Sequence, residues 1–390
     1  MTAYLNALGL VCALGRDQAE VARRLFAGDR SGMRAADGWV PDKTVVVGAV
    51  AGELATLPGE SRNNRLLHAA ALQIEAPLRA AIARYGRQRV GVVLGTSTSG
   101  IEEASQGIAE YLREGQFPPS YDYAQQELSA PAVFLADWLQ LSGPAYVIST
   151  ACTSGARALL SARRLLDLGL CDAVICGGVD SLCKLTLNGF TALEAMSGAL
   201  CNPFSVNRDG INIGEGAALF LMTREANAEG ASIALLGAGA SSDAHHISAP
   251  EPGGKGALAA MQKALDDAGL EAAQIDYLNL HGTATRHNDA MESLAVDALF
   301  GARLPCSSSK AMTGHTLGAA GALEAAFCWL SLAHGQLPPH LWDGQQDPEL
   351  ASLNLIGPGQ RLRAGGPHHL MSNSFAFGGN NISLILGDTP

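Results

Sequence analysis

The chain has 390 residues, of which 47% are hydrophobic and 16% charged, and its formal net charge is −11. A chain of this length and composition can bury a large core, so we expect little disorder. The negative charge argues against general binding to nucleic acids, because a polyanion would be repelled, and any acidic protein partner would need a local cluster of positive charge.

The N-terminus could be mistaken for a signal peptide, because residues 1–15 carry no charged side chain. No basic segment precedes the apolar stretch, which is also shorter than the roughly 20 residues of a membrane span. We therefore expect a first strand and no membrane span. The eight cysteines form no Cys-x-x-Cys pair, which indicates neither a structural zinc site nor a disulfide framework. Free thiols predict a reducing, cytoplasmic location.

Apolar strand-like segments alternate with helical ones along the chain, which predicts an α/β fold with buried sheets. Strands are expected at residues 44–50, 89–94, 145–148, 173–176 and 217–222, and again at 232–238, 277–280, 305–307, 369–371 and 381–386. Helices are expected at 67–85, 156–168, 257–268, 289–300 and 318–334. The two series have similar length and order, which suggests an internal duplication with its join near residues 227–231 and both halves packed as one body.

A cysteine stands between one of these strands and the next helix, in the run Ser149-Thr150-Ala151-Cys152-Thr153-Ser154-Gly155. A side chain at a sharp strand-to-helix turn lies at the helix N-terminus, where the backbone dipole favours an anion and shifts a thiol towards thiolate. This placement suits a nucleophile that accepts an acyl group. The alternative is a buried core cysteine, the commonest fate of a free thiol.

Two histidines have similar settings near strand ends. His281 follows the apolar segment 277–280 and opens a His-Gly-Thr-Ala-Thr run, while His315 closes a Lys-Ala-Met-Thr-Gly-His run ahead of a small-residue helix that contains Glu324. Loops at such positions form active-site floors. For any single histidine, a structural role is the alternative.

Together these runs resemble the β-ketoacyl-acyl-carrier-protein synthases, the elongating ketosynthases of the thiolase superfamily. The resemblance covers nearly the whole chain and also includes the segment 203–216 and the loop 373–379. It implies a thiolase-like, five-layered αβαβα fold of two duplicated halves. The N-terminal half, residues 1–230, would carry the nucleophile, and the C-terminal half, residues 231–390, would carry both histidines.

The resemblance further implies an acyltransferase that condenses malonyl-carrier protein, with loss of carbon dioxide, onto an acyl chain held on Cys152 in fatty acid or polyketide elongation. The backbone N–H groups of Cys152 and Phe377 would form an oxyanion hole. Neutral His281 and His315 would donate hydrogen bonds to the enolate derived from malonyl. No cofactor and no metal are expected, because the phosphopantetheine arm arrives on the carrier protein.

Other residues receive roles from the same resemblance. Lys310 is expected against His315, with Glu324 nearby, so that its charge keeps that histidine neutral. Thr283 and Thr285 match the pair that hydrogen-bonds the phosphopantetheine arm, with simple turn support as the alternative.

Phe375 and Phe377 belong to the loop that gates the acyl pocket in relatives, and Phe190 matches a position that lines this pocket. Many relatives have glycine between the two phenylalanines of this loop, but this chain has Ala376, which lacks the φ > 0 freedom of glycine. The run 285–289 also differs from that of the housekeeping members of the family. Both differences favour a specialised ketosynthase of a polyene or aryl-polyene pathway over a housekeeping fatty-acid elongase.

Competing classes fit the residues less well. A biosynthetic thiolase would need a second cysteine in the loop 377–381, and initiating or chalcone-type enzymes use a Cys-His-Asn set. A dinucleotide-binding enzyme would need a motif of three glycines. The run that begins at Gly237 is incomplete, because Ser242 occupies the position of the third glycine. A non-catalytic chain-length-factor-like subunit lacks the nucleophile that Cys152 supplies, and it is kept as the alternative function.

The expected partners are acyl- and malonyl-carrier proteins, together with a second copy of this chain or a related ketosynthase-like subunit, because relatives dimerise through the central sheet. Carrier proteins are acidic, so docking needs local positive charge. Arg62 and Arg65 in the basic run 61–65 are the candidates, with an ordinary solvated surface as the alternative.

Overall fold

The structure is a computed structural model that describes residues 2–57, 59–227 and 233–388. The strands of the first half are β1 (Ala3–Cys12), β2 (Met33–Val40), β3 (Lys43–Gly48), β4 (Val90–Gly95), β5 (Ala145–Ile148), β6 (Ala173–Asp180), β7 (Ile213–Gly214) and β8 (Gly216–Thr223). Its helices are α1 (Gln18–Ala27), α2 (Arg62–Gln73), α3 (Glu75–Tyr85), α4 (Ile101–Glu114), α5 (Ala130–Leu139), α6 (Ser154–Asp167) and α7 (Lys184–Ala192).

The second half contains six strands and four α-helices in its described residues. The strands are β9 (Ile233–Ser242), β10 (Tyr277–Asn279), β11 (Pro305–Ser307), β12 (Asn354–Leu355), β13 (His369–Phe375) and β14 (Asn380–Asp388), and the helices are α8 (Lys255–Ala268), α9 (Arg286–Phe300), α10 (Lys310–Thr313) and α11 (Ala320–His334). Each strand expected from the sequence has a counterpart here, although residue 232 lies outside the described residues.

Eleven strands form one sheet in the order β12-β11-β10-β13-β14-β9-β1-β8-β6-β4-β5. The five main strands of each half, taken in chain order, lie in the spatial order third, second, fourth, fifth, first: β5-β4-β6-β8-β1 and β11-β10-β13-β14-β9. The strands β1 and β9 join the halves through two residue pairs, Ala3 with Leu235 and Tyr4 with Ala234. The same topology thus occurs twice. The expected domain boundary at 230/231 lies outside the described residues and stays a prediction.

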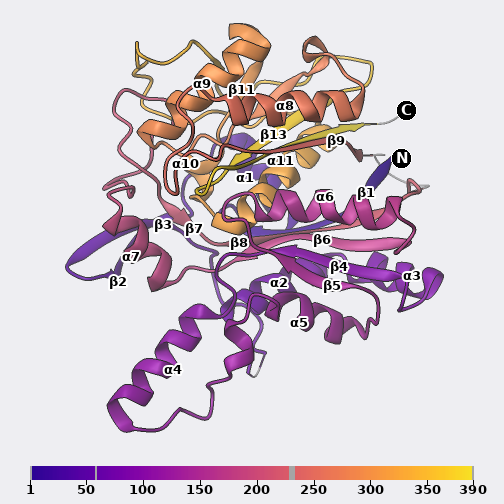
Figure 1. The fold of residues 1–390 in the computed structure, drawn as a ribbon, viewed down its shortest axis with the longest axis vertical. Coiled ribbons are helices and arrows are strands. Elements are labelled where there is room, and N and C mark those ends of the chain that lie inside the picture. The colour runs from indigo at the N-terminus through magenta and orange to yellow at the C-terminus, as the bar shows by residue number, and fades with distance from the viewer. Residues whose placement is uncertain (1, 58, 228–232, 389–390) are drawn as a thin grey trace.

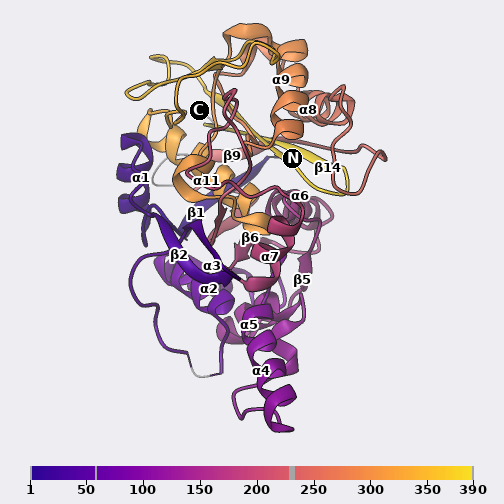
Figure 2. The same ribbon diagram turned by 90° about the vertical axis from the view of Figure 1, so that its left-hand side faces the viewer.

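Helices fill the space between the two half-sheets and cover their outer faces (Figure 1, Figure 2). The helices α6 and α11 lie in the middle, α2, α3 and α5 cover the N-terminal half-sheet, and α8 and α9 cover the C-terminal one. This is the expected five-layered αβαβα arrangement. A Cβ atom on Gly155 of α6 would lie 2.8 Å from the Ala322 nitrogen of α11, so this close contact requires glycine.

The central helix explains the one candidate membrane span in the described residues. The segment Leu317–His334 is long and apolar enough to cross a membrane, but 78% of it is buried inside the protein. Its apolar side chains belong to the core between the two half-sheets.

The helix expected at residues 67–85 is in fact two helices, so this expectation was wrong. The break falls at Ile74, between α2 and α3, where φ is −120°. Pro77 lies in the first turn of α3, and a proline has no N–H to donate and clashes with the carbonyl four residues earlier. The break could not be recognised from the periodicity of the apolar residues alone.

Candidate active site

Cys152 lies in the turn between β5 and α6. Ala151 adopts a φ of 51°, which is left-handed backbone and uncommon for a residue other than glycine. The Ser154 hydroxyl holds the turn, because it accepts a hydrogen bond from the Thr150 N–H at 2.9 Å and donates one to the Ala151 carbonyl at 2.6 Å. Strained backbone of this kind occurs where a side chain must be aimed. Only 5% of Cys152 is exposed.

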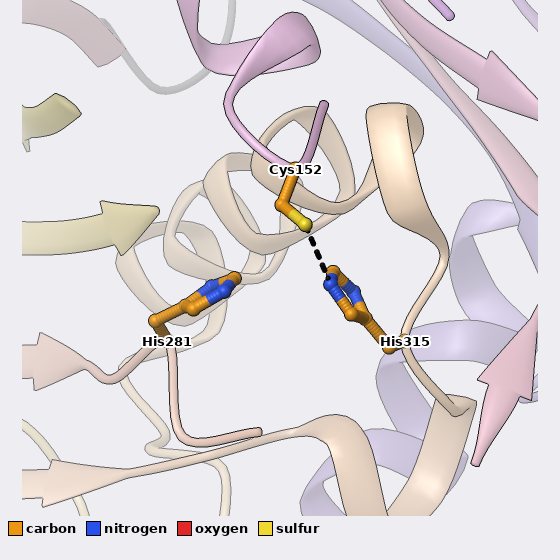
Figure 3. A group of neighbouring side chains, drawn as sticks. All are labelled: Cys152, His281 and His315. Atoms are coloured by element: carbon orange, nitrogen blue, oxygen red, sulfur yellow. Dashed lines mark hydrogen bonds between the residues drawn. The ribbon is translucent and has the colours of Figure 1, made fainter. Parts of the chain in front are cut away.

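The side chains of Cys152, His281 and His315 converge on one point (Figure 3). His315 Nε2 lies 3.0 Å from Cys152 Sγ, and the two imidazole ring centres are 5.3 Å apart, with the rings almost perpendicular. All three residues are buried, and their donor atoms lie within 4.8 Å of one another. Such a set is also chemically able to hold a metal ion; that the site works without one stays a prediction.

The Cys152 thiol does not have the lowered pKa that its place before a helix led us to expect. Burial raises the pKa of Cys152 to about 11, although the charge of Lys310 and the backbone N–H groups of Phe377 and Cys152 act in the opposite direction. The expectation was wrong because desolvation of a fully buried sulfur outweighs these stabilising dipoles and charges. At neutral pH the resting group is therefore a thiol, with His315 Nε2 placed to take its proton.

Lys310 contacts the other histidine. Its Nζ lies 3.3 Å from His281 Nδ1 and 2.5 Å from the His281 carbonyl oxygen, and it also pairs with the buried Glu324 carboxylate. The expected contact with His315 was wrong: the chain turns at Gly314, where φ is 69°, and His315 extends to Cys152 instead. The buried Lys310–Glu324 pair thus lies on the Nδ1 side of the His281 ring.

This contact settles which nitrogen of His281 carries the proton. An ammonium group only donates hydrogen bonds, so Nδ1 is the acceptor and Nε2 carries the hydrogen. Burial lowers the pKa of both histidines well below the usual value, and the charge of Lys310 lowers it further. Both rings are therefore neutral at pH 7, as we expected, and can act as N–H donors.

A buried carboxylate of α9, which the sequence analysis missed, holds the backbone at His281. Glu292 accepts hydrogen bonds from the N–H of His281 at 2.8 Å and of Gly282 at 2.7 Å, and its burial raises its pKa to about 7. Asp289 similarly accepts from the Ala284 N–H at 3.2 Å. The available signal was that both acids fall on the face of α9 that also carries the apolar Met291, Ala295 and Val296.

The backbone of His315 is held by strand-like pairing with the segment around β7. The His315 N–H donates to the Asn212 carbonyl at 2.7 Å, and its carbonyl accepts from the Gly214 N–H at 2.9 Å. The segment 203–216, which the sequence analysis singled out without a role, therefore supports this histidine.

Asp180, the last residue of β6, joins the end of its own strand to the segment after β4 and to the segment after His315, and it was also missed. One of its oxygens accepts hydrogen bonds from the Thr96 hydroxyl, the Ser97 N–H and both the N–H and hydroxyl of Thr98, all between 2.6 and 2.8 Å. The other accepts from the Gly318 N–H at 2.5 Å. Asp180 is fully buried, so this network ties the chain that follows His315 to the N-terminal half.

A cavity of about 500 Å³ lies above these three residues, and the other expected site residues line it: Thr283, Thr285, Phe190, Phe375 and Phe377. The two threonine hydroxyls are 2.9 Å apart, and the Phe190 and Phe377 ring centres are 5.5 Å apart. Ala376 is not in the left-handed region, whereas Gly378 and Gly379 are. The alanine in this loop is thus accommodated without backbone strain.

The two candidate docking arginines take part in ion pairs within the N-terminal half. Arg62 binds both oxygens of the buried Glu215 carboxylate, at 2.7 and 2.5 Å, and Arg65 lies 3.9 Å from a Glu103 oxygen. A partner would have to compete with these carboxylates for the same cations.

Comparison with known sequences identifies two domains. Residues 65–228 match the N-terminal domain of β-ketoacyl synthases, and residues 233–342 match the C-terminal domain. A 3-oxoacyl-[acyl-carrier-protein] synthase 2 of Rhizobium meliloti (strain 1021) is 41% identical over 263 residues, which span 63% of this chain and 61% of that relative. A protein of the same name from Staphylococcus aureus is 35% identical over 319 residues, 76% of each chain.

Solved structures give matches over the full length. A ketosynthase in complex with its chain length factor from Xenorhabdus doucetiae contains a chain that is 47% identical, with a TM-score of 0.94, covering 100% of this chain and 98% of that one. A β-ketoacyl synthase from Burkholderia phymatum STM815 is 29% identical with a TM-score of 0.88 and full coverage of both chains. These matches confirm the expected thiolase-like fold and the resemblance stated from the motifs.

Proposed function

The chain belongs to the β-ketoacyl synthase family, and we propose that it is an active condensing enzyme that joins a malonyl-derived unit to an acyl group held on Cys152. The observation that carries this proposal is the compact Cys152–His281–His315 arrangement, with 3.0 Å between Sγ and the His315 Nε2. A non-catalytic chain-length-factor-like subunit, the alternative, has no use for a nucleophile and two neutral N–H donors at the floor of a cavity.

The first step transfers the acyl group. Cys152 Sγ attacks the carbonyl carbon of an acyl-carrier thioester while its proton passes to His315 Nε2. The carbon–sulfur bond to the carrier then breaks, and the carrier thiol leaves with that proton. The backbone N–H groups of Cys152 and Phe377, which lower the pKa of the Cys152 thiol, would hold the oxyanion of the tetrahedral intermediate, and fixed backbone donors need little reorganisation.

The second step makes the new carbon–carbon bond. The bond between the malonyl carboxylate and its α-carbon breaks, carbon dioxide leaves, and the electron pair forms an enolate on the carrier thioester. The Nε2–H group of His281 would stabilise the enolate oxygen. His315, whose Nε2 gave its proton to the carrier thiol in the first step, would join it as a donor once exchange with solvent has moved its hydrogen from Nδ1 to Nε2. The α-carbon attacks the acyl carbonyl, the bond to Cys152 breaks, and the sulfur leaves as a thiolate that takes up a proton.

Lys310 and Glu324 would support this step as positioning residues. The ammonium group fixes the Nε2–H tautomer of His281 and, by its charge, opposes protonation of either histidine. Buried Glu324 neutralises the ammonium, because a lone buried charge would be costly.

We further propose that this chain pairs with a chain-length-factor-like subunit and acts in a specialised pathway, such as polyene or aryl-polyene elongation. The 47% identity to a chain of a ketosynthase–chain length factor complex supports this pairing. The edge strand β5 supports it as well, because among the described residues it pairs only with β4, which leaves its other edge open to a partner. The eight buried free cysteines support a reducing compartment such as the cytoplasm.

Product analysis by mass spectrometry tests these proposals together. The purified chain, alone and with a candidate partner subunit, is given malonyl-carrier protein and competing saturated, unsaturated and aryl-primed acyl-carrier proteins. Extension only of conjugated primers, or only with the partner, supports the specialised heterodimer. Extension of saturated chains by the chain alone contradicts it, and no extension of any primer under any condition contradicts the condensing activity.

A further inference from the structure

One flank of the N-terminal half-sheet is left uncovered at β5. Every residue of the neighbouring strand β4 is buried, whereas no residue of β5 is fully buried. The outer edge of β5 pairs with no other strand among the described residues. Val133 of α5, the helix that packs against β5, is 50% exposed. A strand with half-exposed apolar side chains and an open backbone edge is a template for pairing with another chain.

The helix α6 adds an exposed stripe on the same flank. Within residues 154–166 only Arg157, Ser161 and Arg164 are not buried, and their spacing of four and three residues places them on one face of the helix. The Ser161 hydroxyl lies 2.7 Å from the Tyr146 hydroxyl of β5, so this basic stripe runs beside β5. Figure 2 shows α6 and β5 on one side of the molecule and α1 on the opposite side.

The flank is basic although the protein as a whole is acidic. The run 138–166, which contains β5 and all of α6 except its last residue, has three arginines and no Asp or Glu, in a chain whose net charge is −11. Arg163 is paired with Asp267. Arg157 and Arg164, the two arginines of the basic stripe, have no salt bridge in the part of the chain that the structure describes. The flank therefore offers positive charge to a partner.

The surroundings of Arg157 show that a carboxylate is missing there. Its Nη2 reaches only neutral oxygens, the Ser241 carbonyl at 3.4 Å and the Asn380 side chain at 3.3 Å, and its buried Nε has no hydrogen-bond partner among the described residues. Burial and the charge of Arg164 lower the pKa of Arg157. A partner that covers the basic stripe removes further water from both guanidinium groups, and a buried charge without an opposite charge is costly. The covering surface therefore has to bring carboxylates.

A second copy of this chain would bring the wrong charge. When two identical edge strands pair antiparallel, the two-fold axis is perpendicular to the sheet, so equivalent helices lie on the same face. The α6 of the copy would thus lie beside this α6 across the axis and would carry the same acid-free run 138–166. Arginines would face arginines, and like charges placed together across an interface are strongly unfavourable.

We propose that the flank formed by β5 and the basic stripe of α6 binds a ketosynthase-like subunit that presents Asp or Glu side chains to Arg157 and Arg164, and that the stripe disfavours a homodimer. This inference rests on the proposed pairing with a related subunit and names the charge that this subunit must carry. An acidic carrier protein fits less well, because the stripe lies beside an open strand edge, which a partner completes by adding a strand.

The test uses a charge-reversed copy of this chain as the acidic partner. The wild type, Arg157→Glu/Arg164→Glu and an equimolar mixture of the two are compared by analytical ultracentrifugation over a range of concentrations. The matched control is Arg16→Glu/Arg23→Glu, which makes the same charge change at two exposed residues on or just before α1, the helix on the opposite side of the molecule. No primer and no carrier protein are needed, so the result does not depend on the condensing activity.

The mixture should form a dimer at least about tenfold tighter than either protein forms alone, because contacts between like charges become ion pairs across the interface. Added salt should weaken this mixed dimer, since it screens the attraction. The control variant mixed with the wild type should associate no more tightly than the wild type alone. If Arg157→Glu does not fold, Arg164→Glu alone, at an exposed position, should show the same preference to a smaller, several-fold extent.

A wild-type homodimer as tight as the mixed dimer would overturn the selection by charge, and the absence of a dimer in the mixture would overturn the docking surface. Either result leaves the condensing activity in place, because that activity is judged separately by acylation of Cys152. A chain that forms the mixed dimer but is never acylated would contradict the proposed function and not this surface.

Discussion

The two halves of this protein share one strand order but use the ends of equivalent strands differently. By position in the sheet, β4, β5 and β6 correspond to β10, β11 and β13. Hydroxyl residues follow β4, whereas His281 follows β10. The turn after β5 carries Cys152, and the longer segment after β11 carries Lys310 and His315.

The difference lies in what holds each set of strand ends together. In the N-terminal half the buried Asp180 carboxylate gathers the donors after β4, and Cys152 lies in the turn after β5. In the C-terminal half a buried ion pair, Lys310–Glu324, stands behind two neutral histidines. In the mechanism that we propose, one half thus supplies the nucleophile and the other the donors for negative charge. The following predictions separate these two contributions.

Removing the nucleophile should have the largest effect. Cys152→Ala should lower acyl-enzyme formation by at least about 10³-fold, to the background, because no other group can form the thioester. Intact-protein mass after incubation with acyl-carrier protein measures it. Cys183→Ala, which removes another buried free cysteine, should leave acylation intact. Acylation of Cys152→Ala at wild-type rates would contradict the assignment.

Removing a donor from the other half should act on a different step. His281→Ala should lower carbon dioxide release from malonyl-carrier protein by about 10²–10³-fold, the usual cost of one donor to a developing oxyanion. Its acylation rate should change little, because His281 makes no hydrogen bond to Sγ, whereas His315 does. A parallel loss of acylation would show that the division between the halves is wrong.

Much of the fold was predictable because buried strands carry a strong apolar signal. The strands at 145–148 and 305–307 were predicted at their observed bounds, and the three central site residues followed from motif resemblance. The Lys310 contact could not be predicted, because it depends on how the chain turns at Gly314. The pKa of Cys152 depends on complete burial, and the role of Asp180 depends on contacts between strands far apart in sequence.

Disturbing the Asp180 network should have an intermediate effect. Asp180→Asn places an amide NH₂ among N–H and hydroxyl donors, so the chain after His315 should shift away from Cys152. We expect kcat to fall about 10- to 100-fold at nearly constant KM, because a small misplacement of catalytic groups is costly. Thr98→Val, which removes one of several donors, should have a smaller effect. A change in KM alone would indicate a role in substrate binding instead.

The smallest effect concerns the ionisation of the nucleophile. Because the pKa of Cys152 is raised to about 11, the thiolate fraction, and with it the alkylation rate by iodoacetamide, should rise about tenfold per pH unit from pH 7 to pH 10. Lys310→Met should slow alkylation several-fold, since its positive charge favours the thiolate. Lys184→Met, an exposed lysine on α7, is the control. A plateau below pH 8 would contradict the raised pKa.

The most direct test of the central claim measures both half-reactions on Cys152→Ala and His281→Ala side by side. Acyl-enzyme is read by intact mass and carbon dioxide from labelled malonyl-carrier protein. Our account predicts a crossed result: Cys152→Ala is not acylated but still releases carbon dioxide, whereas His281→Ala is acylated but releases almost none. Loss of both reactions in both variants, each folded like the wild type, would contradict the separate roles of the two halves.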